Sequence, residues 1–220
     1  LGSGFKIAMR DLSIRGAGNL LGAQQHGFID SVGFDLYSQM LTEAVQRKQG
    51  KNTQTEKTSV EIDLGIDAYL PTTYIEDERQ KIEIYKRIRE LETIDMLDEL
   101  QDDLMDRFGE YPDEVAHLLA VGELKMNGDR ALLERIRKQE QLITVVLSKV
   151  GTKAYTVEQL FKSLGHTKLK ATLGVEKEQM HLKLTIPNGM KTMVWLHEVQ
   201  SFVADLRKER YQTMKEKTTQ

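Results

Sequence analysis

Apolar and polar residues alternate from residue 60 to residue 68, where the sequence reads VEIDLGIDA. Successive side chains of a β-strand point to opposite faces, so this pattern predicts a strand with one buried face. Pro71 follows shortly afterwards, and because proline has no amide hydrogen to donate, we expect the strand to end before it. The apolar positions of this strand are Val60, Ile62, Leu64, Ile66 and Ala68.

Apolar residues then recur every three or four positions, which predicts helices. Thr73 and Glu76 have the spacing of a capping box, so we expect the first helix to open there. A second helix is expected at about 94–108. The apolar face of the first helix is predicted to consist of Ile75, Ile82, Tyr85, Ile88 and Leu91.

Glycine and proline mark the limits of the next elements. Gly109 is expected to end the second helix, and Pro112 is favourable in the first turn of a third. The Asn-Gly pair at 127–128 is typical of a helix end, so the third helix is predicted to close there. Residues 129–133 then read as a separate short helix.

Two hairpins are predicted in the second half of the chain. Residues 135–138 and 141–147 flank a polar turn, and residues 169–173 and 180–186 flank the sequence EKEQ. Short strands of this kind, combined with helices, predict an α+β domain whose antiparallel or mixed sheet is covered by helices.

Two further helices complete this domain. Thr156 and Gln159 form another capping-box pair and predict a helix that stops near Gly165. The last helix is expected from Met190 to about Tyr211. Its predicted apolar stripe consists of Val194, Leu196, Val199, Phe202, Val203 and Leu206.

A linker is predicted to separate this domain from the N-terminal part. Residues 48–58 contain no large apolar side chain, which is typical of a flexible connection. Before it, residues 35–47 have the spacing of an amphipathic helix. We therefore expect an N-terminal segment at 1–52, built as a helical hairpin and loop, and a C-terminal α+β domain at 57–220.

Composition limits the class of protein. The chain has 220 residues, of which 40% are hydrophobic, and no cysteine. Disulfides, thiolate metal sites and cysteine nucleophiles are therefore excluded, and a reducing cytoplasm is the expected compartment. No apolar run approaches the roughly 20 residues that span a bilayer, and no signal-peptide pattern is present, so we expect a soluble cytoplasmic protein.

Charge is unevenly distributed although the formal net charge is only −3. Residues 76–114 carry fifteen acidic and six basic side chains, a surplus that would repel a nucleic-acid backbone. An acidic helical surface suits a protein partner better, although solvated helix faces also account for such a pattern. The candidate partner interface comprises Glu76, Asp77, Glu83, Glu90, Asp98 and Asp102.

Four glycines are concentrated in residues 11–27, which read DLSIRGAGNLLGAQQHG. Interior glycine disfavours a helix by about 1 kcal/mol, so a tight bend around Gly16 and Gly18 is expected. Arg15 in such a bend could bind a phosphate or carboxylate with two hydrogen bonds, together with Gln25. The alternative is a surface ion pair. The glycine spacing does not fit a dinucleotide-binding fingerprint.

No complete active site is expected. The five histidines lack metal-ligand spacing, and P-loop, kinase and nucleophile-elbow motifs are absent. Catalytic and metal-binding residues are therefore predicted to be missing. A second candidate for binding is a basic sheet face, although alternating lysines on an edge strand also serve to prevent aggregation. Its members are Arg135, Arg137, Lys138, Lys168, Lys170 and Lys183.

Two adjacent motifs resemble the bacterial transcription-repair coupling factors, the Mfd family. The first is GFKIAMRDLSIRGAGNLLGAQQHG at 4–27, continuing as VGFDLYSQML, and it is similar to the segment that follows the second helicase lobe. A looser form, the translocation motif, occurs in the branch-migration helicase RecG. The second, VEIDLGIDAYLPTTYIEDERQKIEIYKRI at 60–88, resembles the start of the family's C-terminal domain, which RecG lacks.

The resemblance implies a function that the residues alone do not. Family members use ATP and Mg²⁺ to move along double-stranded DNA, release stalled RNA polymerase, and recruit the excision-repair protein UvrA. Arg15, Gly16, Gly18 and Gln25 match the translocation motif, which couples motor closure to DNA movement. Where relatives carry forms such as GEEQSG, this chain has Ala-Gln-Gln-His at 23–26, so the acidic position is not retained.

The resemblance also assigns roles to the two predicted domains. The C-terminal domain of the family packs on the module that recruits UvrA and masks it. A chain beginning after the helicase motifs would have no ATPase activity of its own. The alternatives are a DNA-binding accessory module of a RecG-like helicase and a stand-alone protein-interaction domain.

Overall fold

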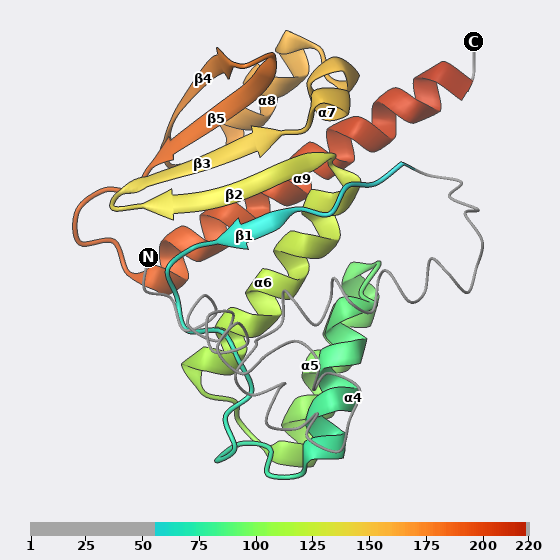
Figure 1. Cartoon of the computed structure of the whole chain (residues 1–220), viewed down its shortest axis with the longest axis vertical. Coiled ribbons are helices and arrows are strands. Elements are labelled where there is room, and N and C mark those ends of the chain that lie inside the picture. The colour runs from blue at the N-terminus through green and yellow to red at the C-terminus, as the bar shows by residue number, and fades with distance from the viewer. Residues whose placement is uncertain (1–55, 219–220) are drawn as a thin grey trace. The chain divides into compact units, whose positions relative to one another are not determined.

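A computed structural model describes the backbone of residues 56–218 and the side chains of residues 56–212. The described residues form two compact units: the helical unit, Gly65–Glu123, and the sheet unit, residues 56–64 with residues 124–218. The predicted α+β class is confirmed. The elements are β1 (Glu61–Asp63), α4 (Glu78–Arg89), α5 (Ile94–Phe108), α6 (Asp113–Arg130), β2 (Leu133–Gln139), β3 (Leu142–Leu147), α7 (Lys149–Ala154), α8 (Val157–His166), β4 (Lys170–Glu176), β5 (Gln179–Thr185) and α9 (Thr192–Thr218) (Figure 1).

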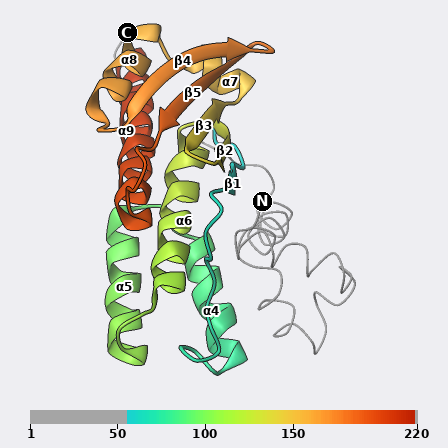
Figure 2. The ribbon, with the colours of Figure 1, turned by 90° about the vertical axis from the view of Figure 1, so that its left-hand side faces the viewer.

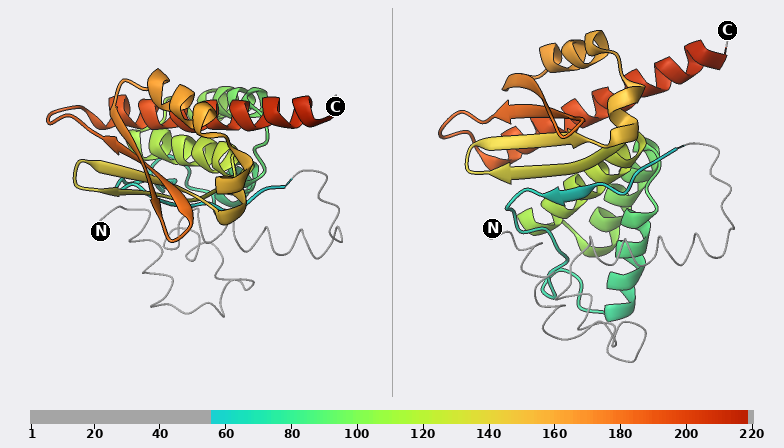
Figure 3. Two further views of the ribbon diagram at one scale, coloured as in Figure 1. Left: turned by 90° about the horizontal axis from the view of Figure 1, so that it is seen from above. Right: turned by 45° about the horizontal axis from the view of Figure 1, so that its top comes forward.

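The sheet unit is built on a mixed sheet in the order β1-β2-β3-β5-β4. Both predicted hairpins are confirmed, since β2 pairs with β3 and β4 with β5, each antiparallel. The register aligns Ile136, Val145 and Leu182 on one face, and all three are fully buried. Helix α9 runs along the sheet, as the two views of Figure 3 show.

Strand β1 is shorter than the sequence pattern predicts, although burial alternates as expected. Only Glu61–Asp63 pair with β2, and they do so in parallel. Gly65, with φ of 69°, adopts a left-handed conformation just after the strand. The five apolar positions of the pattern are all buried. Sequence alternation thus identified the buried side chains but not the extent of the strand pairing.

Helix α5 has the predicted bounds. Thr93 caps its first turn by accepting a hydrogen bond from the amide of Met96 at 3.2 Å, and Gly109 ends it with φ of 83°. The leucines expected on its inner face, Leu97, Leu100 and Leu104, are buried. Within the helical unit, α4 and α5 contact each other, and in the view of Figure 2 the start of α6 is seen between them.

Helix α4 begins later than predicted. The side chain of Asp77 caps it, accepting from the amides of Arg79 at 2.8 Å and Gln80 at 3.1 Å, so the predicted capping box at Thr73 is wrong. Residues 71–75 form a turn instead, in which the Ile75 amide donates to the Pro71 carbonyl. The buried face shifts accordingly: Ile84 is fully buried, whereas the predicted Ile82 is only half-buried.

Helix α6 continues past the predicted end at Asn127 and Gly128 to Arg130, so the separate short helix at 129–133 is also wrong. The reason is close packing. A Cβ atom on Gly128 would lie 3.1 Å from Cγ1 of Val60, so glycine lets this turn approach the segment that leads into β1. The chain turns only at Leu132, whose φ is 63°.

The last helices agree with the sequence in part. The capping box of Thr156 and Gln159 at the start of α8 is confirmed, with both hydrogen bonds formed. Helix α7 was not predicted. Val194 was predicted to belong to the buried stripe of α9, but it is exposed, and its neighbour Trp195 is buried instead. The remaining members of the predicted α9 stripe are buried.

The hydroxyl of Tyr155 is expected to stabilise the sheet unit. It lies 2.6 Å from the carbonyl oxygen of Ala131 and 3.2 Å from that of Leu206, and burial raises the pKa of this phenol. Tyr155→Phe leaves two buried carbonyls without this donor, so we expect the free energy of unfolding to fall by about 1–2 kcal/mol. Urea denaturation would measure the change.

Tyr69→Phe is the matched control, because within residues 56–218 its hydroxyl has no hydrogen-bond partner. Its stability should stay within about 0.5 kcal/mol of the parent chain. Equal effects of the two substitutions would show that the Tyr155 hydrogen bonds contribute nothing.

Candidate partner interface

The six acidic residues predicted as a partner interface all lie in the helical unit, and all are exposed. They are Glu76, Asp77, Glu83, Glu90, Asp98 and Asp102. They do not form one cluster. Asp77 precedes α4 and Glu90 follows it, which separates them by about 20 Å along the helix axis at 1.5 Å per residue. Asp98 and Asp102, four residues apart on α5, share one helix face.

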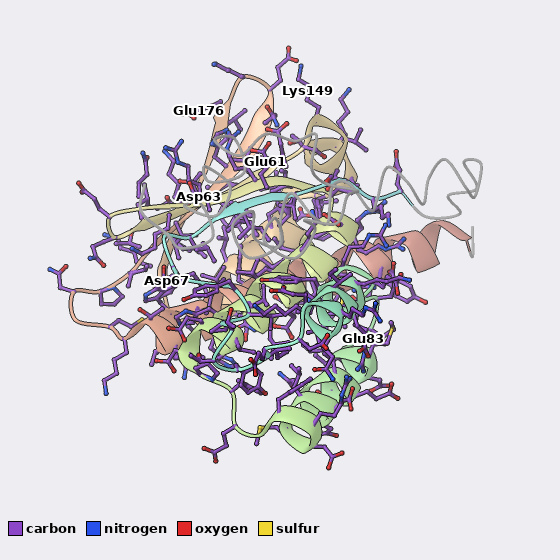
Figure 4. The ribbon with its side chains drawn as sticks, turned by 60° about the horizontal axis from the view of Figure 1, so that its bottom comes forward. Glu61, Asp63, Asp67, Glu83, Lys149 and Glu176 are labelled. Carbon is purple, nitrogen blue, oxygen red and sulfur yellow. The ribbon has the colours of Figure 1, made fainter. Side chains whose placement is uncertain are left out.

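Two of the six also have structural roles. Asp77 caps α4, as described above, and its negative charge suits the positive end of the helix dipole. Glu83 projects from α4 (Figure 4) and pairs with Arg107 of α5 through two hydrogen bonds of 3.1 Å each. Both carboxylates therefore already accept hydrogen bonds within the helical unit.

A four-residue ion-pair network links α4 to α5. Asp103 accepts hydrogen bonds from Arg87 and, at 3.1 Å, from Arg107, which also holds Glu83. The hydrogen bond that Arg87 donates to Asp103 is the main cause that lowers the pKa of Asp103. The hydrogen bonds that Arg107 donates to Glu83 are the main cause that raises the pKa of Arg107. The network neutralises the charges where the two helices meet.

The outward face of α5 keeps its negative charge. Five exposed carboxylates fall within an arc of about 100° around the helix, given 100° per residue, and we call them the acidic face of α5. They are Asp95, Asp98, Glu99, Asp102 and Asp106. Met96 and Met105 flank this arc on either side and are 38% and 45% exposed. Acidic side chains bordered by exposed methionines can combine charge with adaptable apolar contact.

Three of these five residues, Asp95, Glu99 and Asp106, were not selected from the sequence. The signal was available, because the helix at 94–108 was predicted correctly and its periodicity places them beside Asp98 and Asp102. The charge count over residues 76–114 does not distinguish the faces of a helix, so it does not show this arrangement.

The residues predicted for translocation coupling lie outside the described residues. They are Arg15, Gly16, Gly18 and Gln25. Their role stays a prediction, as do the helical hairpin of the N-terminal segment and the domain limits at 1–52 and 57–220.

The predicted basic sheet face is not continuous. The register places Arg135 beside Glu61 and Arg137 beside Asp63, so acidic side chains interrupt the positive charge. Glu61 and Asp63 are labelled in Figure 4. Lys138 follows on the opposite face, where its ammonium lies 5.4 Å from the centre of the Trp195 ring. The register also places Lys170 and Lys183 on the face that carries Arg135 and Arg137.

Residues 56–218 contain neither a metal-binding cluster nor a membrane-spanning helix. No group of three or more histidine or carboxylate side chains in this range could hold a metal ion. None of its helices is both long and apolar enough to cross a bilayer.

The fold is that of the α+β domain found at the C-terminus of transcription-repair coupling factor. A crystal structure of that C-terminal domain matches 73% of this chain and 99% of its own, with a TM-score of 0.69 and 38% identity. The model of the TRCF domain family matches residues 64–177. The chain belongs to the transcription-repair coupling factor family.

Relatives with this name match nearly the whole chain. The Bacillus subtilis transcription-repair-coupling factor is 46% identical over 215 residues, which is 97% of this chain. The Staphylococcus aureus relative is 51% identical over 189 residues, or 86% of the chain. These matches cover 18% and 16% of the two relatives, so the chain spans less than a fifth of their length.

The ion-pair network predicts a pH-dependent contribution to stability. Because the pKa of Asp103 is lowered on folding, its ionised form stabilises the helical unit above the ordinary aspartate pKa of about 4. That contribution is lost as pH falls through the lowered pKa. Asp103→Asn should destabilise the chain by about 0.5–1 kcal/mol at pH 7, with the difference shrinking as the pH falls below 4.

Chemical denaturation at pH 7 and pH 3 would measure this difference. Asp98→Asn is the matched control, since Asp98 is exposed on the same helix and has no ion-pair partner within the described residues. A stability difference for Asp103→Asn that is independent of pH would contradict the assignment.

Proposed function

We propose that this chain is the C-terminal part of an ATP-dependent DNA translocase that releases stalled RNA polymerase and recruits nucleotide excision repair. The likeness to the Bacillus subtilis relative carries this proposal, because it extends over both motifs of the sequence. ATP and Mg²⁺ would bind in helicase lobes elsewhere in the whole protein. Double-stranded DNA, RNA polymerase and UvrA would be its partners, the last through a separate recruitment module.

The N-terminal segment of the chain would couple motor closure to movement of the duplex. Arg15 is the central residue of this proposal, since a guanidinium can hold a phosphate or carboxylate in a fixed geometry with two parallel hydrogen bonds. Gly16 and Gly18 would let the backbone bend beside it, and Gln25 would supply a second polar contact.

Arg15→Ala in the full-length protein tests this coupling. Displacement of stalled RNA polymerase should be abolished while ATP hydrolysis is largely retained, because the substitution removes a transmission contact and no nucleotide ligand. Release of labelled transcript and phosphate production would be measured in parallel. Arg10→Ala is the matched control, and normal displacement by Arg15→Ala would refute the coupling role.

The C-terminal domain would make an autoinhibitory contact that masks the UvrA-recruiting module. The acidic face of α5 is the candidate surface, since its carboxylates are exposed and those of the ion-pair network are already paired. Exposed ion pairs contribute little individually, about 0–1 kcal/mol, so the face would act mainly through orientation and association rate.

Reversing two charges on this face should expose the recruitment module. In the full-length protein, Asp98→Lys combined with Asp102→Lys would place ammonium groups opposite basic partner residues, and we expect the affinity for UvrA to rise by about tenfold. Surface plasmon resonance with immobilised UvrA would measure the change.

Glu140→Lys combined with Glu178→Lys supplies the control, because these exposed residues lie in the hairpin turns of the sheet unit. It changes the net charge equally without altering α5. Equal gains for both double variants would indicate a general charge effect, and no gain for the α5 variant would exclude its acidic face as the masking surface.

A further inference from the structure

Strand β4 forms one edge of the mixed sheet and presents unpaired backbone groups. It is the last strand in the order β1-β2-β3-β5-β4 and the outermost strand in Figure 1. In an antiparallel pair, alternate residues direct their amide and carbonyl groups toward the partner strand, and the residues between them direct theirs away. Within the described residues, the backbone of Lys170–Glu176 is hydrogen-bonded only to β5. The outward groups of β4 can therefore pair with another strand.

β4 lacks the features that commonly protect an edge strand. Proteins often place a proline, a bulge or a charge in the middle of such a strand, which prevents pairing with other chains. β4 pairs with β5 over all seven residues without a register shift, and its sequence KATLGVE contains no proline. Its five central residues are uncharged, and Val175 is 63% exposed. The strand is therefore a regular template for strand addition.

The sequence of β4 is complementary to itself in antiparallel order. When two copies are aligned around Leu173, Lys170 of each copy lies opposite Glu176 of the other, and twofold symmetry forms this charge pair twice. Opposite charges and apolar pairs across two strands stabilise a sheet. The remaining opposed pairs of this alignment are Ala171 with Val175, Thr172 with Gly174, and Leu173 with itself.

The two charged side chains are free to form these pairs. Lys170 is exposed and has no ion-pair partner within residues 56–212. The side chain of Glu176 is 62% exposed, and its Oε2 lies 3.4 Å from Nδ1 of His181, which leaves the other carboxylate oxygen for a second cation.

Backbone geometry and charge together select one register. Lys170 and Glu176 are six residues apart, so both project from the same face of β4. Strands that pair through their outward backbone groups align residues of the same face, so the register can slip only in steps of two residues. One step would align Lys170 with Gly174 or with Glu178, which lies beyond the strand. Only the register centred on Leu173 pairs the whole strand.

We propose that two copies of this chain associate edge to edge through β4, which joins their five-stranded sheets into one continuous sheet. A single pair of seven-residue strands is small beside the roughly 1,600 Å² interface of stable complexes, so the dimer is weak. We expect a Kd on the order of 100 μM. The pairing uses neither the acidic face of α5 nor Arg15, so it is independent of the function proposed above.

Sedimentation equilibrium of the 220-residue chain, from about 10 μM to about 1 mM, tests the proposal. Lys170→Glu places like charges opposite each other at both symmetric positions and should weaken the dimer by about tenfold or more. Lys86→Glu is the matched control, because it changes the net charge equally at an exposed position of α4. A chain that stays monomeric, or equal weakening by both substitutions, would overturn the proposal.

Charge exchange tests the register. Glu176→Lys alone should weaken the dimer, whereas a chain that carries Lys170→Glu and Glu176→Lys together should recover it. An equimolar mixture of the two single variants should also associate, because each can pair with the other but not with itself. Retained NMR signal dispersion would show that Glu176→Lys folds without its contact to His181. Failure of both the double variant and the mixture to associate would contradict the register.

Amide hydrogen exchange tests the pairing of the backbone directly. As the concentration of the chain rises, every second amide of β4 should become protected, because only alternate residues direct their amides toward the new strand. The amides of β3, which has strands on both sides, are the internal control and should not change. A dimer that forms without alternate protection in β4 would assign the association to another surface and overturn the proposal.

Discussion

The parallel pairing of β1 with β2 is the constraint on which the rest of the structure depends. Parallel strands cannot be joined by a tight turn, and here the connection contains the whole helical unit. Hydrogen bonds hold the returning chain in place: the amide of Thr58 donates to the carbonyl of Asp129 at 3.0 Å, and the amide of Val60 donates to its carboxylate at 2.8 Å. Lys125 donates to the Val60 carbonyl at 3.3 Å. The sheet unit is therefore complete only when residues before and after the helical unit meet.

This topology explains why charge is distributed as it is. The helical unit, inserted between two paired strands, has its own core of leucine and isoleucine side chains and its own ion-pair network around Asp103. The ion pairs between α4 and α5 neutralise charge where the two helices meet, and the outward side of α5 keeps five exposed carboxylates. Five of the fifteen acidic residues at 76–114 thus share one helix face, whereas others, such as Glu76, Asp77 and Glu90, lie elsewhere on the helical unit.

Local signals in the sequence were sufficient for elements that depend on local interactions. The bounds of α5, the capping box of α8 and both hairpins follow from periodicity, caps and turns. The predictions that were wrong concern elements whose structure depends on contacts between residues far apart in the sequence. Gly128 stays helical because it packs against Val60, and the parallel partner of β1 lies more than 70 residues away. The charge count over residues 76–114 found the acidic helix but not the face on which its carboxylates lie.

The acidic face of α5 would act on a basic partner through long-range attraction. It is exposed, so salt screens it, and it would act mainly on the rate and orientation of association. Glu83 and Asp103 already accept hydrogen bonds from arginines, so they would add little to that attraction. Added salt should therefore slow the association of such a partner more than it changes its dissociation.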